Sequence, residues 1–273
     1  MRICLLLLLC YLFGNQSTFG QLSPPGIDGA KAVSWTAVGI NQAITKKWAI
    51  NSYVGESRQS DPDNLSLLRK QAILVLNQET YWTIDSHWRL AFCTSFRLQN
   101  LYKHESPFKE DSPSLRDEIR YYTRLFYKHQ IRKVILSYSF RPEYRTFYNS
   151  IQRPEHKYAS ELRLRMKVQI STPIRESKKY SAIIANELLT ATDHYPIEDG
   201  ANWSPYHFTE NRFSTYLQYK FNNLPIVLDI GMMHQIFQKE GKLNYIPYLS
   251  LDLLFINPFS KKKQTVESFY QLK

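Results

Sequence analysis

The stretch ELRLRMKVQI, residues 161–170, alternates charged or polar side chains with apolar ones at every step. A period of two predicts a β-strand, because successive side chains point to opposite faces of a sheet. One face of this strand is fully apolar, whereas the other carries three cations and a glutamate. Such a strand suits a soluble sheet with one wet face, or a wall between lipid and a polar lumen.

The same alternation recurs along most of the chain. Across 83–98, for example, Trp88 and Phe92 lie on the face opposite Arg97. No segment has a convincing apolar stripe at the helical period, so the predicted class is all-β. Eleven strands are predicted, at approximately 33–44, 48–58, 67–80, 83–98, 115–129, 132–148, 157–172, 179–190, 208–221, 225–237 and 244–256.

Short turns alternate with longer polar links between these segments. This alternation is typical of up-and-down barrels in outer membranes, which have short periplasmic turns and long outer loops. The predicted fold is an antiparallel up-and-down transmembrane β-barrel of about 10–12 strands, covering residues 33–257. Short turns are predicted at 45–47, 81–82, 130–131, 173–178 and 222–224, and longer links at 59–66, 99–114, 149–156, 191–207 and 238–243.

In a membrane, energetics would fix the register of the charged strand, although a soluble sheet with a wet outer face would hold the same charges. A cation on the lipid face at mid-depth costs about 2–4 kcal/mol, so slipping residues 161–170 by one position would cost roughly 6–12 kcal/mol for its three cations. The predicted strands are also long for a globular domain, in which about 5–6 residues is typical. A soluble exported lipocalin-like barrel that binds a small apolar ligand remains the alternative, with its apolar faces turned inward.

Aromatic side chains gather near the predicted short turns. In a membrane barrel such side chains form a girdle at headgroup depth. The residues concerned are Trp48, Tyr81, Trp82, Phe126, Tyr127, Tyr180, Tyr219, Phe221 and Phe255.

The N-terminus has the pattern of a secretory signal peptide. Arg2 precedes an apolar run over 3–13, and a short polar stretch leads to Gly20. We therefore predict that residues 1–20 are removed. The mature chain then keeps Cys93 alone, which excludes an internal disulfide. The predicted destination is the outer membrane of a Gram-negative bacterium, with residues 21–32 as an N-terminal segment and 258–273 as a tail.

An odd strand count conflicts with the even number usual in single-chain bacterial barrels. Three explanations stay open. Residues 21–32 thread back through the lumen, a strand has been missed, or the tail near Val266–Tyr270 contributes.

Charged side chains of the predicted strands point inward together. Cross-strand pairs of opposite charge stabilise a ladder, and about 10–12 strands enclose little beyond their own side chains. The favoured interpretation is a lumen filled by ion pairs, and the alternative is a selective passage whose cationic excess prefers anions. The predicted network comprises Arg120, Arg124, Arg141, Glu143, Arg145, Glu161, Arg163, Arg165, Glu187, Glu210 and Arg212.

Other chemistry has weaker support. The net charge of +11 is spread along the chain without a nucleic-acid-binding module, so no nucleic-acid partner is predicted. No catalytic residue, metal or cofactor is predicted. His234 falls on an apolar face and is the residue to test for a barrel phospholipase. An oxygen-rich loop at 61–64 and the pair His194 and His207 suit a metal less well than they suit solvated loops.

Several motifs together resemble a known family. The stretch FTENRFSTYLQYKF at 208–221 precedes DIGM at 229–232, and ANELL, ELRLRMKV, FRPEYRTF and KKWAINSYVGESR stand elsewhere in the chain. In order and spacing they resemble the domain of unknown function 2490 family, uncharacterised outer-membrane β-barrel proteins of Gram-negative bacteria. The resemblance covers nearly the whole mature chain and implies an outer-membrane barrel without an assigned activity. The chain departs from the family pattern in the 16 residues that follow Asn257.

The sequence thus predicts an integral outer-membrane barrel of uncharacterised role, either structural or allowing limited solute passage. It is not expected to be an enzyme. Its expected partner is membrane lipid, no protein partner is indicated, and a monomer is expected.

Overall fold

The computed structural model describes residues 24–148, 160–174, 179–197, 200–239 and 241–260. Within these ranges the regular structure is entirely β. No helix there is long and apolar enough to cross a membrane. The strands are β1 (Val33–Ala43), β2 (Trp48–Gln59), β3 (Lys70–Thr83), β4 (Trp88–Tyr102), β5 (Glu110–Ile131), β6 (Val134–Tyr148), β7 (Ser160–Ile174), β8 (Tyr180–Ile197), β9 (Gly200–Trp203), β10 (His207–Lys220), β11 (Ile226–Lys239) and β12 (Lys242–Ile256).

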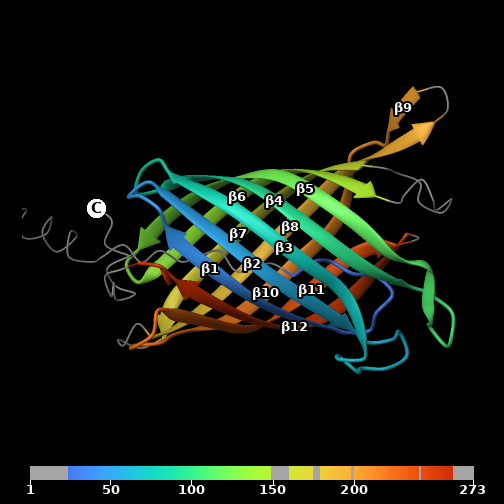
Figure 1. Cartoon of the computed structure of the whole chain (residues 1–273), viewed down its shortest axis with the longest axis horizontal. Coiled ribbons are helices and arrows are strands. Elements are labelled where there is room, and N and C mark those ends of the chain that lie inside the picture. Colours follow the sequence, from blue (N-terminus) through green and yellow to red (C-terminus); the bar gives the residue numbers. More distant parts are fainter. Residues whose placement is uncertain (1–23, 149–159, 175–178, 198–199, 240, 261–273) are drawn as a thin grey trace, which may run out of the picture.

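Eleven of these strands form the wall of a closed barrel (Figure 1). Each wall strand pairs with the next along the chain, and β8 pairs with β10 to continue the wall past β9. Strand β9 instead forms a hairpin with the end of β8, projecting from one end of the barrel. The predicted all-β barrel and its size are confirmed, since each predicted segment overlaps one wall strand.

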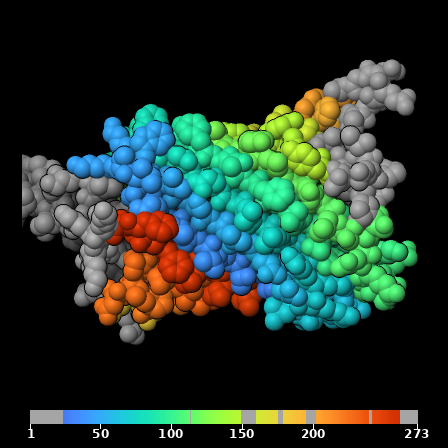
Figure 2. Space-filling view, in the orientation of Figure 1, coloured from blue at the N-terminus to red at the C-terminus, as the bar shows by residue number. Residues whose placement is uncertain are grey.

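The barrel closes through a parallel pair, so the fully antiparallel prediction is wrong at one seam. Strand β1 runs alongside β12 from Val33 opposite Tyr248 to Asn41 opposite Ile256. In an up-and-down barrel each strand reverses direction, and an odd number makes the first and last strands run the same way. Figure 2 shows the blue N-terminal strands lying directly against the red C-terminal part.

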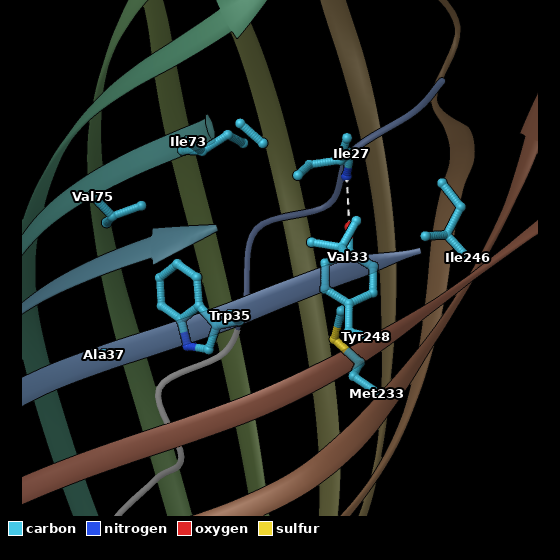
Figure 3. Packing of buried hydrophobic residues seen from close by; sticks show 10 residues of the cluster. Ile27, Val33, Trp35, Ala37, Ile73, Val75, Met233, Ile246 and Tyr248 are labelled. Atoms are coloured by element: carbon cyan, nitrogen blue, oxygen red, sulfur yellow. Dashed lines mark hydrogen bonds between the residues drawn. The ribbon is translucent and has the colours of Figure 1, made fainter. Parts of the chain in front are cut away.

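The start of the described chain, from Pro24 to Ile27, lies inside the barrel (Figure 3), whereas Asp28 and Lys31, in the bend that leads to β1, are exposed. The backbone N–H of Ile27 donates to the Tyr248 hydroxyl at 2.9 Å and to Oε1 of Gln235 at 3.2 Å. Arg212 donates from Nη1 to the carbonyl of Pro24 at 2.8 Å. Of the three explanations for the odd count, the described part of the N-terminal segment fits the first. The signal peptide, residues 21–23 and the tail near Val266–Tyr270 lie outside the described residues.

Several predicted connections differ in the structure. The turn at 130–131 is wrong, because β5 continues to Ile131 and the turn lies at 132–133. The link at 99–114 is shorter than predicted, because β4 continues to Tyr102 and β5 begins at Glu110. The turn at 81–82 is wrong, because β3 continues to Thr83 and the chain reverses over 84–87. The Asp85 carboxylate accepts the backbone N–H groups of His87 at 2.7 Å and Trp88 at 2.8 Å, which fixes this turn. The link at 191–207 is shorter than predicted, because β8 continues to Ile197 and pairs with β9.

The two faces of the wall separate apolar from polar side chains. On β7, Met166 and Val168 are each 46% exposed on the outside, whereas Arg165 is buried at 4%. Each of the eleven wall strands carries an outward apolar or aromatic side chain that is 42–56% exposed, namely Val38, Val54, Leu76, Phe92, Tyr121, Phe140, Val168, Ile184, Leu217, Ile230 and Leu251. The lipocalin-like alternative requires the opposite arrangement and is not favoured.

Aromatic rings pack side by side at the short-turn end. Trp48 stacks on Trp82 with ring centroids 6.2 Å apart, and Trp88 lies 4.8 Å from Tyr127. Two residues assigned to this girdle point inward instead. Tyr81 is buried, and its ring lies 5.8 Å from that of Phe126, because both occupy inward positions of their alternating strands.

An apolar cluster surrounds residue 27 where β1 begins (Figure 3). Trp35 is 1% exposed, and its indole N–H donates to Asp252 at 2.9 Å. The cluster therefore fixes the N-terminal segment against the inner wall. Its members are Ile27, Val33, Trp35, Ala37, Ala72, Ile73, Val75, Met233, Ile246 and Tyr248.

Candidate functional site

The candidate site is a set of charged side chains inside the barrel, here called the luminal network. It contains the eleven predicted residues, Arg120, Arg124, Arg141, Glu143, Arg145, Glu161, Arg163, Arg165, Glu187, Glu210 and Arg212, together with Glu79, Arg97 and Glu118.

Glu118 on β5 accepts hydrogen bonds from two arginines that face each other. Arg120 and Arg145 lie directly across the β5–β6 ladder, where like charges are destabilising on their own. Arg145 donates from Nε to Oε1 of Glu118 at 2.6 Å, and Arg120 forms a short ion pair with the same carboxylate. Arg97 on β4 lies 3.8 Å from it. One carboxylate thus offsets the repulsion of the facing pair.

Glu143 on β6 likewise offsets the repulsion between two arginines that face each other. Arg141 and Arg165 face each other across the β6–β7 ladder. Arg141 lies 2.7 Å from Oε2 of Glu143, and Arg165 lies 3.7 Å from it. Arg120 donates to the other carboxylate oxygen at 3.0 Å. The Glu143 side chain is 0% exposed, so its charge depends on these cations.

Ion pairs continue from β6 to β7. Arg145 reaches Glu161 at 2.6 Å, and Arg163 lies 2.7 Å from the same carboxylate. Arg163 also lies 3.4 Å from Glu210 on β10, which is not a neighbour of β7 in the wall. This last contact crosses β8 and follows from the curvature of the barrel.

The network ends on β8 and β10. Arg165 donates twice to Glu187, and Arg212 donates from Nη2 to Glu210 at 2.6 Å while lying 3.8 Å from Glu187. Because Arg212 also binds the Pro24 carbonyl, the network is joined to the N-terminal segment.

A smaller group of side chains lies around Glu79 of β3, at the other end of the luminal network from β10. Arg124 lies 3.2 Å from Glu79, and the Tyr122 hydroxyl donates to the same carboxylate at 2.7 Å. The guanidinium of Arg141 lies 3.4 Å from the centroid of the Tyr122 ring, a cation–π contact that joins this group to Glu143.

The network carries an excess of positive charge. Eight arginines pair with six glutamates, an excess of two. Paired charges inside a protein attract more strongly than in water, but they must first be desolvated. The arrangement can therefore block the lumen while presenting a net cationic interior.

Glu79, Arg97 and Glu118 were absent from the predicted network. Glu118 alternates with Arg120 on one strand, so the period of two already placed it on the inward face. Arg97 had been placed on the polar face of its strand but was not assigned to the network. A second omission is the pair Asp229 and Asp252, which face each other across the β11–β12 ladder.

His234, the residue considered for phospholipase activity, has aromatic neighbours. His234 lies on the outer face between the rings of Phe213 and Tyr245, 6.3 Å and 5.5 Å away. Its Nδ1 contacts the Tyr245 hydroxyl, so its partner is a phenol and not a serine.

The proposed metal positions also have other partners. The Asp61 carboxylate pairs with Lys70 and with Arg69 at 3.0 Å. His194 packs on Trp203 at 5.0 Å, and His207 lies 3.7 Å from Asp193. In the part of the chain that the structure describes, no three His, Cys, Asp or Glu side chains gather as a metal site.

A family model described as "Protein of unknown function (DUF2490)" matches residues 32–245. The chain belongs to the DUF2490 family. The matched span begins one residue before β1, includes every residue of the luminal network and ends at Tyr245, within β12, so it covers ten of the wall strands and the start of the eleventh. The resemblance inferred from the sequence motifs is thereby confirmed. Neither curated proteins nor solved structures gave a significant match.

Proposed function

We propose that the protein is an integral outer-membrane barrel, monomeric and surrounded by lipid, whose lumen is closed by its own side chains. The observation that carries this proposal is the outward apolar side chain on each of the eleven wall strands. Burying such a surface requires lipid or a protein partner. Strand β7 has 15 residues, and at ~3.3 Å each with a tilt near 40° it covers more than the roughly 25 Å apolar band of outer-membrane barrels.

Closure of the lumen is supported by two features. The luminal network spans β3 to β10, and residues 24–27 fill part of the remaining space beside β11 and β12. The role that follows is structural, with any passage limited to very small solutes. No reaction, cofactor or nucleic-acid partner is part of the proposal.

Fractionation of a Gram-negative host that expresses the full chain tests the location. We expect the protein in the outer-membrane pellet after carbonate and high-salt washes. We also expect faster gel mobility when the sample is not boiled, because folded barrels resist the detergent used in such gels. Release by carbonate without detergent would contradict the proposal.

Planar-bilayer recording tests closure separately. The wild-type barrel should show no steady open level, whereas deleting residues 24–32 should increase the frequency of openings. A steady open level in the wild type contradicts a closed lumen.

A further inference from the structure

A small cavity lies inside the barrel, beside the luminal network. Four arginines from four successive strands line it, Arg97 of β4, Arg120 of β5, Arg141 of β6 and Arg165 of β7. Asn77 and Ser95 add polar groups. The described residues that line the cavity include no aspartate or glutamate. The cavity wall therefore presents hydrogen-bond donors and positive charge, while the neutralising carboxylates lie behind it.

The charge of these four arginines is only partly compensated by the carboxylates. Glu118 and Glu143 are shared among them, and the contacts of Arg97 to Glu118 and of Arg165 to Glu143 are long, at 3.8 Å and 3.7 Å. Among the described residues, Arg165 alone of the four has a further close carboxylate partner, Glu187. Unit charges in a poorly hydrated interior interact over such distances far more strongly than in water, so an anion in the cavity is electrostatically favoured.

Two buried donors of the lining lack a partner. The Nε of Arg141 and the Nδ2 of Asn77 form no hydrogen bond, although each residue is only 6% exposed. Leaving a buried donor unsatisfied costs about 1–3 kcal/mol, and more where the group is charged. The other groups of these side chains are engaged. Arg141 reaches Glu143, and Oδ1 of Asn77 lies 2.8 Å from the Tyr122 hydroxyl, whose single proton it shares with Glu79.

The size of the cavity limits the ligand. Its enclosed space holds about one water-sized particle. Chloride, with a radius of about 1.8 Å against about 1.4 Å for water, is the common anion nearest to this size and needs the lining side chains to move by only a few tenths of an ångström, whereas phosphate, sulfate and carboxylic acids are much larger. We propose that this cavity is a binding site for one small halide ion, which accepts hydrogen bonds from the buried guanidinium and amide donors.

Halide binding is testable on the purified wild-type barrel in detergent, so the result does not depend on the membrane location. Chloride or bromide, titrated into chloride-free gluconate buffer at constant ionic strength, should raise the unfolding midpoint in a saturable manner, because a ligand of the folded state stabilises it. Crystals grown in bromide should show an anomalous peak within contact distance of Arg141 and Asn77. Equal midpoints in chloride and gluconate, or no peak in the cavity, overturn the proposal.

A matched pair of variants assigns the effect to the cavity. Asn77→Asp keeps the acceptor for Tyr122 but replaces the free donor by a negative charge, and should weaken halide affinity by at least about tenfold. Arg116→Gln removes a cation outside the lining, one that donates to Gln99 at 2.5 Å, and should leave the affinity unchanged. Equal losses in both variants would mean that general positive charge, and not this cavity, attracts the ion. If Asn77→Asp does not fold, the wild-type titration and the bromide crystals still test whether the cavity binds a halide ion.

Discussion

Arg165 and Glu187 form two parallel hydrogen bonds between β7 and β8, Nε to Oε1 at 3.0 Å and Nη2 to Oε2 at 2.7 Å. Both side chains are nearly excluded from solvent, at 5% and 9% exposure. The planar guanidinium matches the carboxylate in this two-bond geometry, which a lysine could not reproduce. The pair therefore fixes the register of β7 on β8 from the luminal side, in addition to the backbone ladder.

Removing one member of this pair should destabilise the barrel strongly. Glu187→Gln leaves the Arg165 and Arg212 charges under-compensated, and the free energy of unfolding should fall by about 3 kcal/mol, as for other broken buried pairs. Urea titration of the barrel refolded in lipid vesicles measures this change. Glu56→Gln is the control, since the Arg58–Glu56 pair is 37% and 39% exposed and should contribute less than about 1 kcal/mol. Equal effects of both variants would contradict a buried network.

An arginine placed on the outer face should lower the free energy of unfolding by an amount that depends on its depth in the bilayer. Val168→Arg lies near the middle of β7 and should cost about 2–4 kcal/mol in a bilayer, whereas Leu162→Arg near the strand end should cost about 0–1 kcal/mol. The free energy of unfolding from lipid vesicles measures both. Similar small costs at the two positions would indicate that water, and not lipid, contacts this face.

Gly26 allows close contact between the N-terminal segment and the wall. A Cβ at this position would lie 2.5 Å from Oε2 of Glu210 and 2.7 Å from Nε2 of Gln235. Gly26→Leu should therefore displace the segment and expose the amide of Ile27. Faster hydrogen exchange of a peptide covering 24–32, measured by mass spectrometry, is the expected result. Lys31→Ala, at an exposed position, is the control and should exchange as the wild type does.

The loop over 60–69 should loosen in acid. Burial alone would raise the pKa of Asp61, but hydrogen bonds from Lys70 and Asn64, helped by neighbouring positive charge, lower that pKa below its ordinary 3.8. A lowered pKa in the folded state means that the carboxylate stabilises the loop above its unfolded pKa, and that this stabilisation is lost as the pH falls through the lower folded value.

Lys70, which pairs with Asp61, also contacts the loop between β4 and β5. Its ammonium donates to the Phe108 carbonyl and lies 4.5 Å from the Tyr102 ring centroid. Asp61→Asn should therefore increase protease cleavage of both loops at neutral pH, and wild-type cleavage by an acid-stable protease should rise below about pH 3.8. Pepsin and trypsin digests analysed by mass spectrometry measure the two cases. Unchanged cleavage in the variant would mean that Asp61 does not hold the loops.

Much of the wall was predictable because outward and luminal positions alternate along most of each strand. The order Glu161, Arg163 and Arg165 already places three charges on one face, and the structure finds all three inside. The alternation along a strand does not predict which luminal side chains of non-adjacent strands contact each other. Arg163 reaches Glu210 only because the wall curves past β8.

The errors have local causes. The turn after β3 lies over 84–87 because the Asp85 side chain binds two backbone N–H groups, a contact that alternation does not reveal. The parallel seam follows from the odd strand count, for which the sequence alone left three explanations open. Ile27 fits the first explanation, because its backbone N–H is bound from inside the barrel to Tyr248 of β12.

Site-directed spin labelling along β7 tests the central claim most directly. Single cysteines at positions 162–170, introduced one at a time with Cys93→Ser, carry a nitroxide in the barrel refolded into lipid vesicles. We expect the labels at positions 162, 164, 166, 168 and 170 to collide preferentially with oxygen, which partitions into lipid. The labels at positions 163, 165, 167 and 169 should be shielded from it. Loss of this alternation, or preferential collision of a water-soluble nickel reagent with the even positions, would contradict a lipid-facing apolar wall around a charged lumen.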